Sequence, residues 1–265
     1  MNHLLRPLAP ISDETWQLLD GEARQRLEPA LAARRLVDFS GPHGWAHSAT
    51  PLGRTTQAEG APVEGVSGRR RVVLPLVEVR AAFELSREEL RDADRGADDV
   101  DLAPLDAAAF RIASAENAAV LNGWPGVARG IAESSTQEPG SLAGDPDGYR
   151  HQLARAVERL LSSGVAGPFG LALGSEHYRR VTESAPDGYP LVDHLKSITN
   201  GPILWAPGLD GGVLVSLRGG DFVLDAGQDL SIGYDSHDAE SVRLYLEESF
   251  SFHVATPEAA VALRG

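Results

Sequence analysis

The segment from Val242 to Val254 constrains the fold of this chain more than any other part of the sequence. Its even positions are Val, Leu, Leu, Glu, Phe, Phe and Val, and the odd positions between them are Arg, Tyr, Glu, Ser, Ser and His. Alternation of this kind predicts a β-strand. Its thirteen residues, at about 3.3 Å each, give a strand of roughly 40 Å, about twice the typical length. We therefore expect an elongated molecule.

Residues 49–75 form the second unusual segment. They are polar and rich in glycine, and they lack helical periodicity as far as Arg71. A structureless stretch of this length inside a folded domain is typical of a binding loop or a projecting arm. The residues that follow, from Val77 to Leu85, alternate between apolar and polar and predict a half-buried strand.

Helices are predicted on both sides of this arm. Ser12 caps a first amphipathic helix, which Pro29 should kink or end. Ser86 and Glu89 form a capping box for a short helix that ends at Gly96, and Asp101 caps a longer helix that reaches Gly123. A further helix starts near Asp147 and is expected to turn four residues inward: Leu153, Val157, Leu160 and Leu161. Between residues 165 and 220, short apolar runs and helical patterns indicate a compact α/β subdomain.

Composition excludes several classes of protein. The chain has 265 residues, enough for one large domain or two small ones, and carries 24 basic and 38 acidic side chains, a net charge of −14. This charge argues against a protein that mainly neutralises nucleic-acid phosphates. The absence of cysteine rules out disulfides, thiolate zinc sites, iron–sulfur clusters and cysteine nucleophiles. With no signal-like amino terminus and no apolar run of about 18 residues, we expect a soluble, cytoplasmic protein without membrane contact.

No recognisable catalytic motif is present, so we expect no catalytic residues, no cofactor and no metal site. His43 and His47 have a spacing that binds metal on a helix, but Pro42 and Gly44 argue against a helix, which leaves two loop or strand histidines. Two further groups of polar residues need no catalytic or metal site to explain them. Asp235, His237 and Asp238 fit a solvated turn. Asp98, Asp99 and Asp101 fit the acidic start of a helix.

Several distinctive strings nevertheless resemble one family. They are NxLxRxLAPIS at the start, ARRLVDFSGPHGW, RDADRG, GPFGLAL, DGYPLVDHL, ILWAPGLDGG, RGGDFVLDAGQDLSIGY and RLYLEESFSFHVATPEAAVAL. In this order they resemble the encapsulins, also called linocin-like bacteriocins, from about residue 2 to residue 263. Pro29 and Ala33 depart from the family pattern, which puts the exit of the first helix in doubt but leaves the fold as expected.

The resemblance implies an α+β chain with the HK97-like phage capsid fold. It divides the chain into an inward-facing amino-terminal helix and the start of a peripheral domain (1–48), an extended loop (49–75), a peripheral domain with a spine helix (76–130), an axial domain (131–221) and a return to the peripheral domain (222–265). The family forms closed shells, the smallest with about sixty copies. The shells enclose a cargo enzyme, usually a dye-decolorizing peroxidase or a ferritin-like protein. A prophage major capsid protein that packages DNA remains the alternative, and a peptidase is a weaker one.

The resemblance also implies two sets of site residues. A shallow apolar groove between the first helix and the peripheral domain should bind the targeting peptide of the cargo, and its matching residues are Leu27, Leu31, Arg34, Asp38, Asp229, Leu230 and Ile232. In the groove, apolar side chains would receive the peptide while Arg34 and the carboxylates fix its direction. A pore on the five-fold axis should be lined by Glu183, Pro186, Asp187, Gly188 and Tyr189, with an acidic ring that attracts cations.

Overall fold

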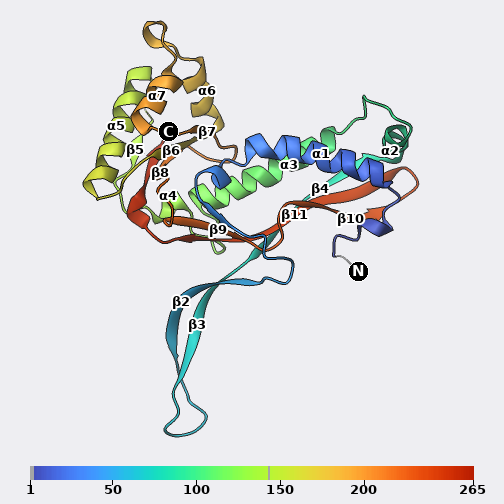
Figure 1. Cartoon of the computed structure of the whole chain (residues 1–265), viewed down its shortest axis with the longest axis horizontal. Coiled ribbons are helices and arrows are strands. Elements are labelled where there is room, and N and C mark those ends of the chain that lie inside the picture. Colours follow the sequence, from blue (N-terminus) through green and yellow to red (C-terminus); the bar gives the residue numbers. More distant parts are fainter. Residues whose placement is uncertain (1–2, 143) are drawn as a thin grey trace.

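The long strand predicted near the carboxyl terminus, β11 (Ser241–Val254), organises the larger of two sheets. The structure, a computed structural model, describes residues 3–142 and 144–265. One edge of β11 pairs antiparallel with β4 (Val77–Ser86), and the opposite edge pairs first with β10 (Ser231–His237) and then with β9 (Phe222–Ala226). β1 (Asp38–Ser40) runs parallel to β9 and completes the sheet. In Figure 1 this sheet extends along the horizontal axis of the molecule, as the length of the strand predicts.

Two helices lie over one face of this sheet (Figure 1). α1 (Asp13–Ala30) starts where the Ser12 hydroxyl accepts a hydrogen bond from the amide of Thr15, and it ends one residue after Pro29, as predicted. α3 (Ala103–Asn117) continues through one π-helical turn to residue 122. The short α2 (Arg87–Asp94) follows β4. The buried side chains between helices and sheet include Trp16, Leu19, Leu105, Ile112, Phe83 and Leu244. Burying each of them contributes about 1.5–3 kcal/mol.

A second sheet lies at the other end of the molecule, in the order β5-β12-β8-β6-β7. Its strands are β5 (Gly140–Ser141), β12 (Ala260–Arg264), β8 (Gly212–Ser216), β6 (Phe169–Leu173) and β7 (Ile203–Trp205). The accompanying helices are α4 (Ile131–Ser134), α5 (Pro146–Ser162), α6 (Ser175–Glu183) and α7 (Leu191–Thr199). The predicted last segment, residues 222–265, therefore contributes to both sheets, because β12 joins the second one.

The prediction for the inner face of α5 was wrong at one position. Leu153 and Leu160 are buried, but Leu161 is 56% exposed. The buried stripe also includes Tyr149 and Ala156, and a residue that follows directly on a buried one is turned by about 100° around the helix axis. Leu161 therefore points away from the second sheet.

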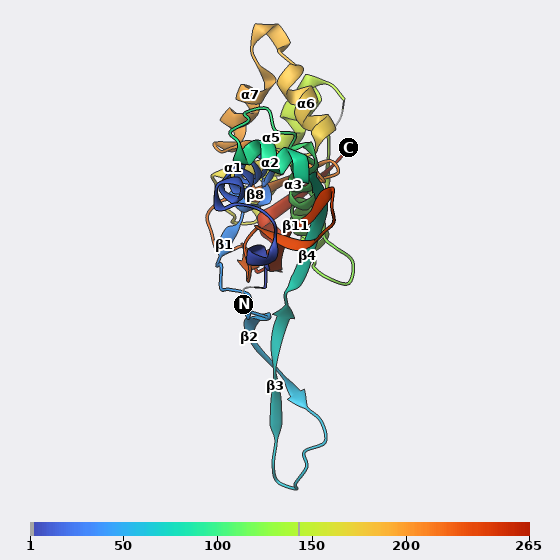
Figure 2. The ribbon, with the colours of Figure 1, turned by 90° about the vertical axis from the view of Figure 1, so that its right-hand side faces the viewer.

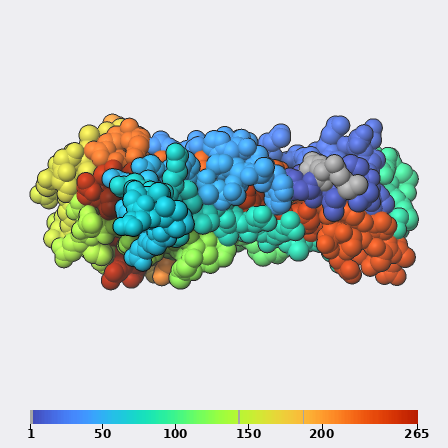
Figure 3. All heavy atoms as spheres, turned by 90° about the horizontal axis from the view of Figure 1, so that it is seen from below, coloured from blue at the N-terminus to red at the C-terminus, as the bar shows by residue number. Residues whose placement is uncertain are grey.

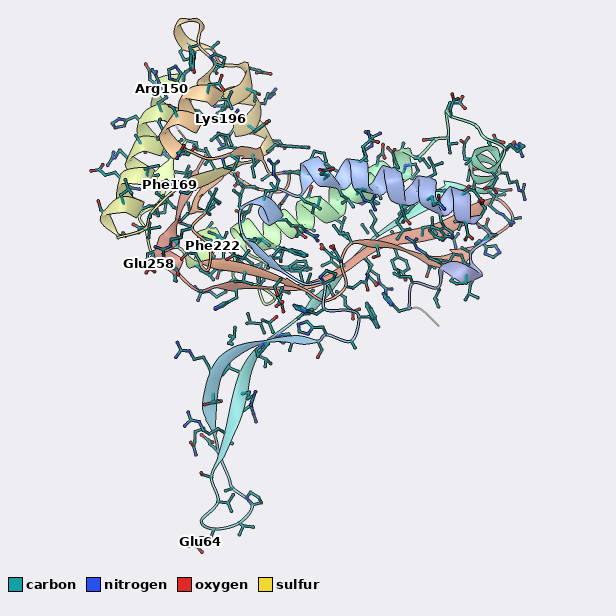
Figure 4. The ribbon with its side chains drawn as sticks, viewed as in Figure 1. Glu64, Arg150, Phe169, Lys196, Phe222 and Glu258 are labelled. Carbon is teal, nitrogen blue, oxygen red and sulfur yellow. The ribbon has the colours of Figure 1, made fainter. Side chains whose placement is uncertain are left out.

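Residues 49–75 form an ordered arm, not a structureless stretch. β2 (Ala49–Ala58) and β3 (Gly68–Pro75) pair antiparallel from Ala49–Pro75 to Ala58–Gly68. Figures 1 and 2 show the arm projecting from the body, and Figure 4 places Glu64 at its far end. All of its residues are described, and none of them is buried. Alternation is absent from its sequence because neither face of the hairpin is covered.

The end of the first helix is tied to the spine helix α3 by one buried amide. The Asn117 Nδ2 donates to the carbonyl oxygens of Ala30 and Pro207, and its Oδ1 accepts from the amide of Ala33 at 2.9 Å. These bonds position the turn that carries Leu31 and Arg34. No helix in the described part of the chain is long and apolar enough to cross a membrane.

Candidate functional site

A groove of about 730 Å³ lies between α1 and the beginning of β10. In the view from below, the amino-terminal segment lies beside the end of the molecule that holds β10 and β11 (Figure 3). The groove is lined by Leu4, Arg6, Asp20, Ala23, Arg24, Leu27, Glu28, Leu31, Arg34, Asp229, Leu230, Ser231, Ile232 and Leu246. Four parts of the sequence thus form one surface: the amino terminus, one face of α1 with the turn after it, residues 229–232, and Leu246 on β11.

The apolar wall of the groove follows from the periodicity of its two main elements. Ala23 and Leu27 share one face of α1, and Leu31 follows directly after the end of the helix, while Leu230 and Ile232 are two apart, as on one face of a strand. Leu27 and Ile232 are 6% and 1% exposed and form the floor. Leu31 and Leu230 are half-buried, so they are the leucines that a ligand in the groove would touch.

Arg6 fastens the amino-terminal segment along one side of the groove. Its guanidinium donates to both carboxylate oxygens of Asp20 at 2.8 and 2.6 Å, and its Nε donates to the carbonyl oxygen of Ile232 at 2.8 Å. The same guanidinium lies 4.5 Å from the ring centroid of Trp16. A two-pronged arginine–carboxylate pair fixes geometry as well as charge, so this side of the groove is rigid.

Arg34 lies at the other end of the groove and is fully engaged within the chain. Its guanidinium donates to Glu116 at 2.7 Å, to Asp229 at 2.6 Å and to Glu248 at 2.9 Å. It also lies 4.9 Å from the ring centroid of Phe39. These contacts leave the side chain of Arg34 only 17% exposed. The prediction that Arg34 is available to orient a bound peptide is therefore not supported by its geometry.

The carboxyl groups around Arg34 differ in their burial. Glu116 and Glu248 are buried, and each accepts a hydrogen bond from the guanidinium of Arg34. Burial raises the pKa of both groups, and the negative charge of Glu116 raises the pKa of Glu248 further. Asp229, in contrast, is half-exposed at the groove, where its carboxylate pairs with Arg34 at 2.6 Å.

Two charged side chains that the sequence analysis did not select border the groove on α1. Arg24 and Glu28 are exposed and four residues apart. Neither has an ion-pair partner within residues 3–142 and 144–265. Each directly follows a member of the buried stripe, Ala23 or Leu27. The sequence could therefore have identified both as charged residues at the border of the apolar face of the helix.

Asp38 is the one predicted groove residue that lies elsewhere. It is exposed at the start of β1, and its Oδ2 accepts a hydrogen bond from the amide of Gly220 at 2.5 Å. It borders a separate small hollow with Leu36 and Phe222. Because β1 leads away from α1 after the turn at residues 33–35, the structure does not bring Asp38 to the groove.

The predicted pore residues lie in the loop between α6 and α7, at one extremity of the molecule (Figure 1). Glu183 ends α6, and residues Pro186–Gly188 form a single 3₁₀ turn. Tyr189 is 52% exposed, and its ring meets His194 edge-on at 4.5 Å. The side chain of Asp187 lies outside what the structure describes.

The remaining candidates from the sequence have structural roles in the described chain. Asp238 accepts bonds from the amides of Glu240 and Ser241, which makes the turn before β11. His237 pairs with the hydroxyl of Tyr234 at 2.6 Å. Asp101 accepts from the amide of Ala103 at the start of α3, but the N-cap of this helix is Leu102, one residue after the predicted position.

Comparisons with known proteins identify the family and the fold of this chain. The family described as "Encapsulating protein for peroxidase" matches residues 1–251. The type 1 encapsulin shell protein of Rhodospirillum rubrum is 47% identical, over 100% of this chain and 97% of its own length. Among solved structures, a virus-like particle from Pyrococcus furiosus matches with a TM-score of 0.69 at 18% identity, covering 95% of this chain and 100% of that one. The capsid of an empty GTA particle matches at 0.51, with 16% identity over 88% of this chain and 89% of that one.

These structural matches show the HK97-like capsid fold, in agreement with the α+β architecture. The sequence matches are more specific, because they run along the whole chain at high identity. The chain belongs to the family of encapsulin shell proteins.

Proposed function

We propose that about sixty copies of this chain assemble into a closed shell with icosahedral symmetry, and that the groove between α1 and β10 binds a short targeting peptide of an enclosed enzyme. The observation that carries the proposal is the groove itself. It combines two half-buried leucines, Leu31 and Leu230, with two charged side chains that have no partner in the described chain, Arg24 and Glu28.

The chemistry of the groove suits an extended peptide with small apolar side chains. Such side chains would cover Leu31 and Leu230, and each buried methylene would contribute about 0.8 kcal/mol. Arg24 and Glu28 lie one helical turn apart and carry opposite charges, so they can select a direction for the peptide. We assign this orienting role to them, because Arg34 is held by its three carboxyl partners.

The cargo that fits this function is a dye-decolorizing peroxidase or a ferritin-like protein. The description of the matching family names a peroxidase. In this proposal the shell works in the cytoplasm and has no catalytic residue or cofactor of its own. Residues 131–221 form an axial domain around the symmetry axes, and the segments 76–130 and 222–265 form the peripheral domain, except that β12 joins the sheet of the axial domain.

The test is co-expression of the shell with a peroxidase that carries a targeting peptide. Leu230→Asp should abolish loading and leave empty particles, because it places a charge in the apolar wall. Leu18→Asp is the control for the added charge: Leu18 is 41% exposed on α1, the helix that borders the groove, but does not line the groove. Loading is measured as haem absorbance that co-elutes with particles. Normal loading of Leu230→Asp shells would refute the placement, and particles filled with nucleic acid would favour a DNA-packaging capsid.

We further propose that the α6–α7 loop surrounds a pore on the five-fold axis. Five copies of Asp187, with Glu183 nearby, would concentrate cations there. Asp187→Lys should slow entry of a cationic cargo substrate and weaken its dependence on ionic strength, while a neutral substrate enters at an unchanged rate. Equal rates in wild-type and variant shells at low and high salt would remove the loop from any gating role.

A further inference from the structure

The turn that leads from β1 toward the arm is held on the edge of the larger sheet by its main chain. The amide of His43 donates to Ala226 O at 2.9 Å, and the amide of Gly44 donates to Gly227 O at 2.8 Å. Gly41 has a φ of +117°, and a Cβ there would lie 2.4 Å from the carbonyl oxygen of Ala226. Only glycine allows this approach. The turn is therefore positioned independently of its side chains.

This turn places two imidazoles on one carboxylate. His43 Nε2 lies 2.9 Å from Oδ1 of Asp225, and His47 Nε2 lies 3.0 Å from Oδ2. The two ring centroids are 4.7 Å apart, and three ligand atoms, one from each residue, lie within 4.8 Å of one another. The sequence analysis rejected a metal site because Pro42 and Gly44 break a helix, but the turn brings the rings together without one.

The surroundings of this carboxylate resemble a built site with an open side. Asp225 is 5% exposed, and its Oδ2 also accepts from the hydroxyl of Thr50, which in turn lies 2.6 Å from Ser251 Oγ. The side chains of His43 and His47 are 41% and 26% exposed. Hydrogen bonds thus fix the carboxylate of Asp225, and the two imidazoles remain accessible from solvent. This arrangement orients metal ligands and lets an ion reach them.

From this geometry we propose that His43, His47 and Asp225 bind one divalent transition-metal ion of the zinc class at the root of the arm. Zinc takes imidazole nitrogen and carboxylate oxygen at about 2.0–2.2 Å in tetrahedral sites, so its ligand atoms lie about 3.3 Å apart. Each histidine nitrogen lies within about 0.4 Å of that distance from a different oxygen of the Asp225 carboxylate, and both nitrogens and one of these oxygens lie within 4.8 Å of one another. On binding, each ring carries its proton on Nδ1 and presents the lone pair of Nε2, and water completes the coordination.

The position of the site gives it a structural consequence. Asp225 belongs to β9, both histidines precede β2, and Thr50 lies on β2 itself. A bound ion would therefore tie the root of the arm to the larger sheet. This inference does not depend on the peptide groove, which lies on other elements.

The test is binding of Zn²⁺ to purified, untagged particles, measured by calorimetry and by metal analysis after desalting. We expect one ion per chain, with binding weakened at least about tenfold in His43→Ala and His47→Ala. His151→Ala, which removes an exposed histidine on α5, is the matched control and should bind as wild type does. Light scattering on each variant verifies that particles are intact.

A second probe gives a spectroscopic signature. Co²⁺ in place of Zn²⁺ should produce strong visible absorption from a four-coordinate site, and His47→Ala should lose it. Fewer than one ion per several chains, or equal binding by wild type and His47→Ala, would overturn the proposal and leave the three side chains as a hydrogen-bonded cluster.

Discussion

The arm and the strand β11 are both long β-structures, but the chain covers them in opposite ways. β11 has paired neighbours on both edges, and its residues from Leu244 to Phe252 are all buried. The arm consists of two strands only, and none of its residues from 49 to 75 is buried. An isolated two-stranded hairpin is marginally stable in water. The body thus buries its core within one chain, whereas the arm does not, and we expect another copy of the chain to cover it.

Removal of the arm is the strongest way to break this comparison. Arg54 and Val72 lie opposite each other in the ladder, so deletion of Thr55–Arg71 can be closed by a two-residue Asn-Gly turn. The variant should keep its core and lose assembly, which changes the mass measured by light scattering from that of a particle to that of a subunit or small oligomer.

Circular dichroism serves as the control for this deletion. Because the removed residues are exposed, the helical signal of α1, α3 and α5 should remain. Particles of wild-type mass would show that the arm is not needed for association. They would contradict the expectation that the arm, unlike β11, is covered by another copy.

Shortening one side chain in each region tests the same difference between β11 and the arm, with a smaller expected effect. Phe250 on β11 is 1% exposed, so Phe250→Ala should lower stability by about 3–5 kcal/mol through lost burial and a cavity. Val73 on β3 is 42% exposed, and Val73→Ala should change subunit stability by no more than about 0.5 kcal/mol. Urea denaturation measures both. If Val73→Ala lowers the free energy of unfolding as much as Phe250→Ala does, a neighbouring copy covers the exposed face of β3 in the particle. The effect of Val73→Ala should then vanish in dissociated subunits.

Local signals predicted much of this fold. The cap at Ser12, the stop near Pro29 and the sequence alternation from Val242 to Val254 each act within a few residues, and the structure has the cap, the helix end and the strand that they predict. Contacts between distant segments were invisible. Asp225 lies 178 residues from His47, and Arg34 lies 214 from Glu248, so no spacing pattern could join them.

In the groove, too, local patterns predicted some residues correctly, whereas long-range contacts decided the position of others. Leu27, Leu31, Leu230 and Ile232 lie on predictable faces, and the structure brings them together. Asp38 was misplaced because the path of the chain after α1 depends on Asn117, a buried residue on another helix. The hairpin of the arm was missed because exposure of both faces removes the alternation that marks a strand.

The last prediction concerns Glu248, one of two buried glutamates of β11. Its pKa is raised above the value in the unfolded chain by burial and by the charge of Glu116. A raised carboxyl pKa gives stability that is fully present below the unfolded pKa of about 4.3 and is lost as the pH rises through the folded pKa. Stability should therefore fall from mildly acidic toward alkaline pH.

Glu248→Gln keeps one donor and one acceptor for Glu116 and Arg34 without a titrating proton, so the fall should become shallower, by about 1.4 kcal/mol for each unit of pKa shift removed. Glu78→Gln, an exposed glutamate on β4 opposite Ser249 of β11, is the control and should leave the pH profile unchanged. Urea midpoints from pH 5 to 9 measure the effect. Parallel profiles for wild type and Glu248→Gln would show that Glu248 is already ionised in the folded chain, and that β11 tolerates a buried charge as readily as the arm tolerates exposed ones.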